Sequence, residues 1–174
     1  MIIKETRLDY DFDVFLNADY STHENSCITD LMKEFKDMYD DLGGFPDSFC
    51  YDNTKFSQLW WSEQQVDYEN IGSQLGIDVI TVSTIKQPAG CVIPLHKDTF
   101  YRINQKHPER TENKVRANIY LEDWKLGHFI QYTDRVSTHW KKGQGLIWDG
   151  DILHLGANAG ISPKYTLQVS GFLI

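Results

Sequence analysis

Cysteine is scarce in this sequence, and the few cysteines present are not arranged as ligands or partners. The 174 residues contain three of them, Cys27, Cys50 and Cys91, and no CxxC spacing occurs. An odd number of widely spaced cysteines argues against a disulfide framework and against a structural zinc site. Unpaired thiols in a reducing cytosol fit this pattern best, so a cytoplasmic location is expected.

Long apolar runs and basic clusters are also missing. No stretch approaches the roughly 20 apolar residues of a membrane helix, so no membrane contact is expected. The first residues read MIIKETRLDYDFD, without a basic segment followed by an apolar one, so no signal peptide is expected. The net charge is −8, and basic pairings are as short as Lys141-Lys142. Because nucleic-acid binders usually carry a basic stripe, a nucleic-acid partner is not expected.

The length and the composition, with 41% hydrophobic and 24% charged residues, suit one domain spanning residues 1–174. The pattern changes near residue 77, which predicts an N-terminal helical or irregular support region (1–76) and a strand-rich core (77–174). In the first region, apolar residues recur at the helical period over 28–42. A weaker helix is predicted between Ser62, where Ser62-x-x-Gln65 resembles a capping box, and Gly76.

Short segments rich in β-branched residues, separated by turns, fill the second region. Many short strands with helices gathered at one end predict a sandwich or jelly roll, in which the helices buttress one sheet. Along residues 115–121 the pattern alternates, with Arg116, Asn118 and Tyr120 on one face. The predicted strands cover residues 79–86, 91–96, 115–121, 128–132, 135–140, 146–148, 152–155 and 165–174.

A His-x-Asp triplet lies within PLHKDT, where His96 and Asp98 would point to the same side of a strand. With 6 His and 25 acidic residues, about one such triplet is expected by chance, so the pair needs a third ligand. His154, in WDGDILHLGAN, follows a turn and leads into a strand. Two His and one carboxylate are the ligand set of non-haem Fe(II) oxygenases, so His96, Asp98 and His154 are the predicted metal ligands.

Iron sites of this kind commonly use 2-oxoglutarate, whose distal carboxylate needs a buried cation. Lys164 follows His154 by ten residues and opens the last predicted strand. An ammonium on a carboxylate forms a charge-assisted pair that strengthens where water is excluded. Thr166, on the same strand face, could donate its hydroxyl. Arg116 and Asn118 are candidates for binding the chelating end of 2-oxoglutarate or the substrate.

The segments PLHKDT, VRANIYL, GQGLIWDGDILHLGANAG and PKYTLQVSG resemble the Fe(II)/2-oxoglutarate-dependent dioxygenases. They look most like the compact forms related to prolyl and aspartyl/asparaginyl hydroxylases, over about residues 79–174. The family pattern is His-x-Asp, a distant His and then Arg or Lys about ten residues later. His96, Asp98, His154 and Lys164 fill it in order, with Lys in place of the more usual Arg.

The resemblance implies a double-stranded β-helix fold with Fe(II) and 2-oxoglutarate. It also implies that a peptide side chain, or a small molecule such as an amino acid, is hydroxylated with O₂ while succinate and CO₂ are released. The carboxylate at Asp98 argues against halogenation. Two alternatives remain open, a non-catalytic jelly-roll binding module with a vestigial metal site and a cupin-type metalloenzyme without 2-oxoglutarate.

The polar segment 99–114 lies between the first ligand pair and Arg116. Long segments of this kind in small domains are often functional, which favours a mobile lid over the site. A plain surface excursion is equally open. If the segment closes, Phe100, Tyr101 and Arg102 would contact the substrate. The sequence indicates neither the particular substrate nor the oligomeric state.

Overall fold

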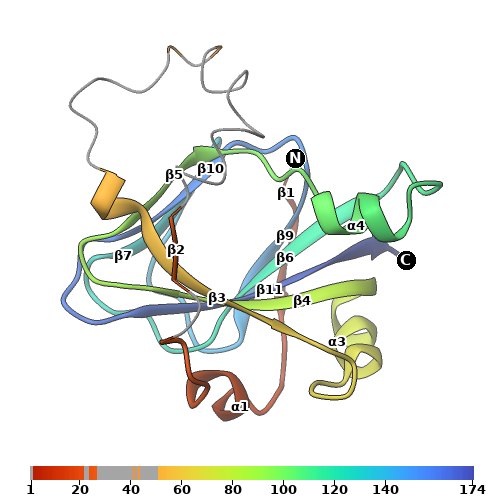
Figure 1. Cartoon of the computed structure of the whole chain (residues 1–174), viewed down its shortest axis with the longest axis horizontal. Helices are drawn as coiled ribbons and strands as arrows, with labels where there is room; N and C mark the ends of the chain where they lie inside the picture. Colours follow the sequence, from red (N-terminus) through yellow and green to blue (C-terminus); the bar gives the residue numbers. More distant parts are fainter. Residues whose placement is uncertain (1, 22–23, 27–40, 42, 44–50) are drawn as a thin grey trace.

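The computed structural model describes residues 2–21, 24–26, 41, 43 and 51–174, and it is built mainly from antiparallel strands (Figure 1). The helical elements are short: α1 (Asp13–Leu16), the 3-10 turn η1 (Tyr51–Thr54), α3 (Tyr68–Leu75) and α4 (Tyr101–Lys106). The strands are β1 (Ile2–Arg7), β2 (Glu24–Ser26), β3 (Lys55–Trp61), β4 (Ile77–Gln87), β5 (Val92–His96), β6 (Lys114–Tyr120), β7 (His128–Tyr132), β8 (Val136–Ser137), β9 (Gln144–Asp149), β10 (His154–Asn158) and β11 (Lys164–Leu173).

The strands form two sheets whose order confirms the predicted jelly roll. The seven-stranded sheet has the order β1-β9-β6-β11-β4-β3-β2, and the four-stranded sheet has the order β5-β10-β7-β8. Strands β4 to β11 therefore distribute between the two sheets so that β4, β6, β9 and β11 face β5, β7, β8 and β10. Every pairing is antiparallel. This is the strand arrangement of a double-stranded β-helix.

The two faces of the large sheet bury different kinds of side chain. One face carries the main apolar core, in which Val169 and Ala117 pack with Phe15 of α1 and Ile71 of α3. In Figure 1, α1 and α3 lie on the side of β3 and β4 away from the small sheet. Since side chains alternate along a strand, the polar residues between these apolar ones face the small sheet. The alternation predicted along residues 115–121 is thus observed in β6, with Arg116 and Asn118 on the inner face.

The N-terminal region departs from the prediction in two respects. Strands β1 and β3 belong to the large sheet, where β1 pairs with β9 and β3 with β4, although no strand was predicted there. The second helix begins later than predicted, because Asp67 rather than Ser62 caps it by accepting from the backbone of Asn70. Ser62 and Gln65 do bond to each other, but only in a turn before the helix.

Other expectations for the N-terminal region have different outcomes. The left-handed Gly76 ends α3 as predicted. Apart from residue 41, the helix predicted over 28–42 lies outside the described residues, as do Cys27 and Cys50. None of the helices in the described part of the chain is long or apolar enough to cross a membrane.

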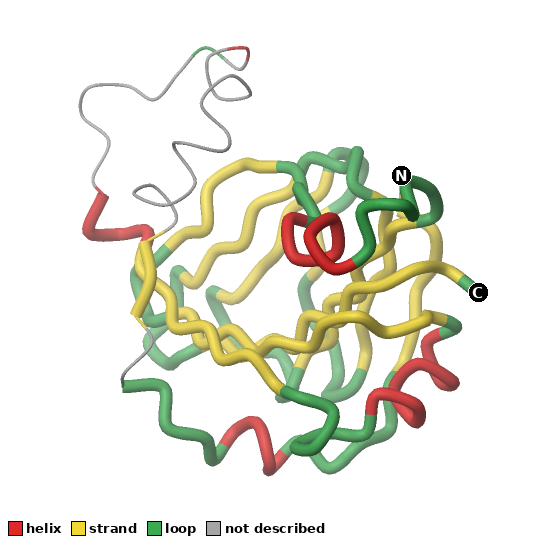
Figure 2. Tube along the Cα trace, turned by 45° about the vertical axis from the view of Figure 1, so that its right-hand side comes forward, coloured by secondary structure: helices red, strands yellow, loops and turns green. Residues whose placement is uncertain are grey.

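The segment 99–114 is anchored to the rest of the fold rather than free of structure. It contains α4, from which Ile103 packs with Phe100 and with Phe172 of β11. Lys114 Nζ donates to Asn104 Oδ1 at 2.6 Å, which ties the end of the segment to the helix. Figure 2 shows α4 at one open end of the layered strands. Opening and closing of this segment remain a prediction.

Candidate metal centre

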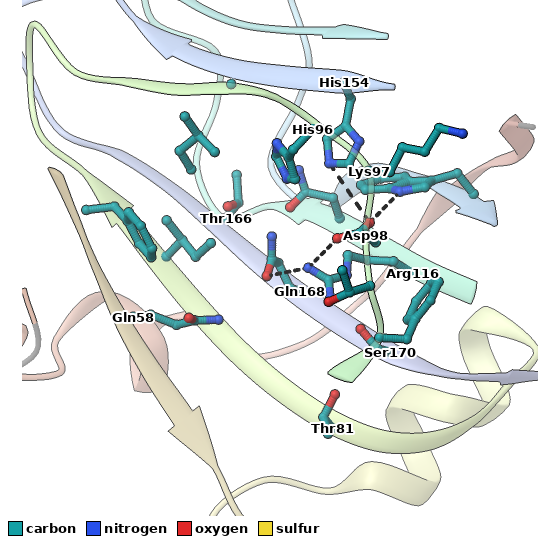
Figure 3. Close-up of a pocket in the computed structure, with 18 of the residues that line it drawn as sticks. Gln58, Thr81, His96, Lys97, Asp98, Arg116, His154, Thr166, Gln168 and Ser170 are labelled. Carbon is teal, nitrogen blue, oxygen red and sulfur yellow. Dashed lines mark hydrogen bonds and ion pairs between the residues drawn. The ribbon is translucent and has the colours of Figure 1, made fainter. Parts of the chain in front are cut away.

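His96 and His154 come from neighbouring strands and lie opposite each other. His96 ends β5 and His154 begins β10, and the antiparallel register pairs the two residues directly. Their ring centroids are 4.3 Å apart. Asp98, two residues beyond the end of β5, reaches the same point, with its Oδ2 3.9 Å from His154 Nε2 (Figure 3). The structure thus brings together the three residues predicted as metal ligands.

The three side chains form a compact cluster that could hold a metal ion. One ligand atom of each lies within 4.8 Å of those of the others. His96 Nδ1 is 2.7 Å from Pro94 O, and His154 Nδ1 is 3.2 Å from Ile152 O. Because a carbonyl oxygen only accepts, each Nδ1 carries the proton, which leaves the lone pair on Nε2. Backbone contacts of this kind fix the tautomer and the ring orientation of metal-binding histidines.

The protonation states of the cluster also suit a cation. Burial lowers the pKa of His96, and burial together with the neighbouring His96 lowers the pKa of His154 to about 4. Burial alone would raise the pKa of the Asp98 carboxyl, but the Arg116 charge and the two histidines outweigh it and hold this pKa below its usual value. At neutral pH the cluster is therefore two neutral imidazoles and one carboxylate, the forms that bind metals.

Two neighbouring residues of the large sheet each hold one oxygen of the Asp98 carboxylate. Arg116 of β6 forms an ion pair with Asp98 Oδ1 at 2.9 Å and also donates to Gln168 Oε1 at 3.0 Å. Trp148 of β9 donates its indole Nε1–H to Asp98 Oδ2 at 2.8 Å. Arg116 was predicted to bind cosubstrate or substrate, and the structure places it beside a metal ligand. The hydrogen bond of Trp148 was not predicted from the sequence.

Lys164 is buried at the start of β11, with 4% of its surface exposed. Its Nζ donates to Phe129 O at 3.1 Å and to Ala157 O at 3.0 Å, and within the described residues no carboxylate pairs with it. Burial lowers its pKa from 10.5 to about 7. A lysine so placed is costly unless an anion joins it.

One cavity of about 280 Å³ connects the metal cluster with Lys164. The buried side chains of Asn118 and Thr166 also line it, so all seven predicted site residues lie on one cavity. Gln87 and Gln168 line the same space and were not predicted as site residues. Gln168 could have been found by continuing the alternation from Lys164 and Thr166 along the last strand. Gln87 could not, because it reaches Lys164 only through the pairing of β4 with β11.

No family model matches the chain, and no curated protein matches its sequence. Similar solved structures include a prolyl-4-hydroxylase of Pseudomonas putida, at 15% identity over 94% of this chain and 100% of that chain, with a TM-score of 0.49. A predicted oxalate decarboxylase of Thermotoga maritima has 15% identity over 68% of this chain and 82% of that chain, with a TM-score of 0.43. A salicylate 1,2-dioxygenase of Pseudaminobacter salicylatoxidans has 8% identity over 83% of this chain and 33% of that chain, with a TM-score of 0.41.

Proposed function

We propose that the protein is an Fe(II)- and 2-oxoglutarate-dependent oxygenase that hydroxylates a peptide side chain or a small molecule such as an amino acid. One observation carries this proposal. A cluster of the buried His154 with the partly buried His96 and Asp98 shares a cavity with a buried lysine, Lys164, that has no carboxylate partner in the described part of the chain. The first feature suits a divalent metal, and the second suits an organic anion bound beside it.

The residues of the cluster fit Fe(II). Two imidazole nitrogens and one carboxylate form the three-ligand set that leaves other positions of an iron ion open. Arg116 and Trp148 hold the Asp98 carboxylate in place, and the backbone carbonyls of Pro94 and Ile152 orient the two imidazoles. Groups around a metal site that orient its ligands in this way raise its affinity for the metal.

The surroundings of Lys164 fit the distal carboxylate of 2-oxoglutarate. An ammonium has three N–H donors, and two of them go to backbone carbonyls, which leaves one for a ligand. Gly156 of β10 faces the ammonium, and a Cβ at this glycine would lie 3.4 Å from Nζ. The missing side chain keeps space open beside the charge. Thr166, the next inward residue of β11, lines the same space and can donate its hydroxyl.

When bound, Fe(II) and 2-oxoglutarate supply the reduction of O₂ coupled to oxidative decarboxylation of the cosubstrate and hydroxylation of a C–H bond. The chain itself positions and shields the reactants. Lys164 and Thr166 orient the cosubstrate, while Asp98 stays ionised through its contact with Arg116. Trp148 and Ile130 line the cavity beside the cluster and keep bulk water away from the ligands.

An anaerobic titration with Fe(II) and 2-oxoglutarate tests the proposal. We expect the weak visible metal-to-ligand charge-transfer band of the ternary complex, absent with His96→Ala. Lys164→Ala should need at least about a hundredfold more 2-oxoglutarate, because a charge-assisted contact in a buried site is lost. Lys86→Ala is the matched control, since Lys86 lies next to the pairing partner of Lys164 but does not line the cavity.

The outcomes separate the alternatives. Succinate release that follows the band would justify a substrate screen. Metal binding without any response to 2-oxoglutarate would favour a cupin-type metalloenzyme. A folded protein that shows no band and binds no metal would reject the oxygenase and leave a binding module.

A further inference from the structure

The wall of the cavity carries an excess of positive charge, although the whole chain has a net charge of −8. Among the described residues that line it, Asp98 is the only carboxylate. The cationic lining residues are Lys97, Arg102, Arg116 and Lys164. The negative charge of Asp98 already compensates the positive charge of Arg116, and the two positive charges of a divalent metal would compensate the two negative charges of a 2-oxoglutarate dianion. Positive charge therefore remains for a second anion.

Arg102 is the cation best placed to bind this second anion. It lies on α4 at the outer part of the cavity, with its guanidinium carbon 3.7 Å from the ring centroid of Trp60. Within the described residues it forms no ion pair and no hydrogen bond. Stacking on an aromatic face fixes the plane of a guanidinium while its edge N–H groups stay available to a carboxylate.

Arg110 provides an internal comparison on the same segment. Its guanidinium carbon lies 3.4 Å from the ring centroid of Phe172, so it is stacked in a similar way. However, Arg110 pairs with Asp78 at 2.6 Å and does not line the cavity. Arg110, outside the cavity, thus has a carboxylate partner, whereas Arg102, on the cavity wall, has none among the residues that the structure describes.

Hydroxyl groups of β11 and β4 line the cavity between Arg116 of β6 and Trp60 of β3, since these strands are neighbours in the order β6-β11-β4-β3. Thr81 of β4 and Ser170 of β11 are paired across the sheet, are buried at 7% and 4% exposure, and both line the cavity. In Figure 3 they lie on the side of Arg116 away from the two histidines. Neither hydroxyl bonds to another described residue, so both are available to a polar ligand. The cavity of about 280 Å³ is small, since ligand pockets usually span about 300–1,000 Å³.

We propose that the substrate is a small molecule with a carboxylate group, which Arg102 binds while Thr81 and Ser170 hydrogen-bond to its polar part. This inference rests on the proposed oxygenase function, because the carbon to be hydroxylated lies between the anion site and the metal. The small volume and the single uncompensated arginine favour a free organic acid over an acidic side chain of a protein.

The test uses the full chain loaded with Mn(II), or with Fe(II) for turnover, and with 2-oxoglutarate. The probes are the proteinogenic L-amino acids, their α-carboxamides, and a peptide that is capped at both ends and has a central Asp. The two readouts are the rise in melting temperature on binding and the rate of succinate release. Arg102→Gln is the test variant, and Arg110→Gln is its matched control.

We expect at least one free acid to bind, and to stimulate succinate release, at least tenfold better than its carboxamide. Arg102→Gln should weaken the binding of that probe about ten- to a hundredfold without changing the response to 2-oxoglutarate. Arg110→Gln should behave like the wild type. The inference is overturned if carboxamides work equally well, if the preference survives Arg102→Gln, if only the peptide responds, or if no free acid binds. Absence of any metal-dependent response to 2-oxoglutarate would instead reject the oxygenase function and the inference with it.

Discussion

The indole Nε1 of Trp148 donates a hydrogen bond to Asp98 Oδ2 at 2.8 Å, although the two residues lie 50 positions apart in the sequence. A hydrogen bond to a metal-binding carboxylate fixes its orientation. Trp148→Phe keeps an aromatic ring but removes the donor, so affinity for Mn(II) should fall about tenfold or more. Trp140→Phe is the control, because Trp140 is buried in the same apolar cluster and does not line the cavity. Equal affinities of the two variants, measured by calorimetry, would contradict this role.

The ion pair between Arg116 and Asp98 predicts how metal binding depends on pH. Arg116 is the strongest of the contacts that hold the pKa of Asp98 below its usual value. In Arg116→Met the carboxyl should therefore protonate at higher pH, and protons should compete with the metal earlier on acidification. We expect Mn(II) affinity to drop more than tenfold below wild type at pH 5.5 and to differ much less at pH 8. Parallel pH profiles of Mn(II) affinity for wild type and Arg116→Met would show that Arg116 does not control the ionisation of Asp98. Arg110→Met is the control and should match the wild type.

Buried Lys164 makes the stability of the ligand-free protein depend on pH. Burial lowers its folded pKa to about 7, whereas the unfolded chain has the usual 10.5. Between these values the unfolded state binds more protons, so the free energy of unfolding should rise with pH across this window, by roughly 3–5 kcal/mol. Urea unfolding of wild type and Lys164→Met from pH 7 to 10 isolates this contribution, because Met cannot titrate. Identical slopes would mean that the lysine stays charged in the folded state.

Much of the metal centre could be predicted because its determinants are local. The i, i+2 spacing of His96 and Asp98 and the turn before His154 are visible in the sequence, and strand alternation places Lys164 beside Thr166. Contacts that depend on sheet register are not visible in this way. The sequence places Arg116 on the inner face of its strand, but only the arrangement of β5 against β6 directs it at Asp98 rather than at a ligand.

The fold of the core could be predicted from its short alternating strands, whereas the edges of the large sheet could not. Strand β1 pairs with β9, more than a hundred residues later, and nothing in its own sequence indicates that partner. Strand β3 carries Trp60 into the cavity wall, yet its residues were assigned to a helical or irregular support region. Both segments form strands because of pairing with distant parts of the chain, and local propensity carries little information about such pairing.

The absence of a side chain at Gly156 should matter for binding of the cosubstrate but not for folding. A Cβ at this position would lie 3.4 Å from Lys164 Nζ and 3.8 Å from Gln87 Oε1, which are ordinary contact distances. Gly156→Ala should therefore fold with a stability within about 1 kcal/mol of wild type, yet bind 2-oxoglutarate at least tenfold more weakly, because the methyl group occupies the space beside the ammonium. Gly171→Ala should instead lose stability but keep its affinity for 2-oxoglutarate, since its Cβ would meet the backbone oxygen of Asp78 outside the cavity. Thermal melts and 2-oxoglutarate titrations of both variants check this, and unchanged affinity in Gly156→Ala would place the anion elsewhere.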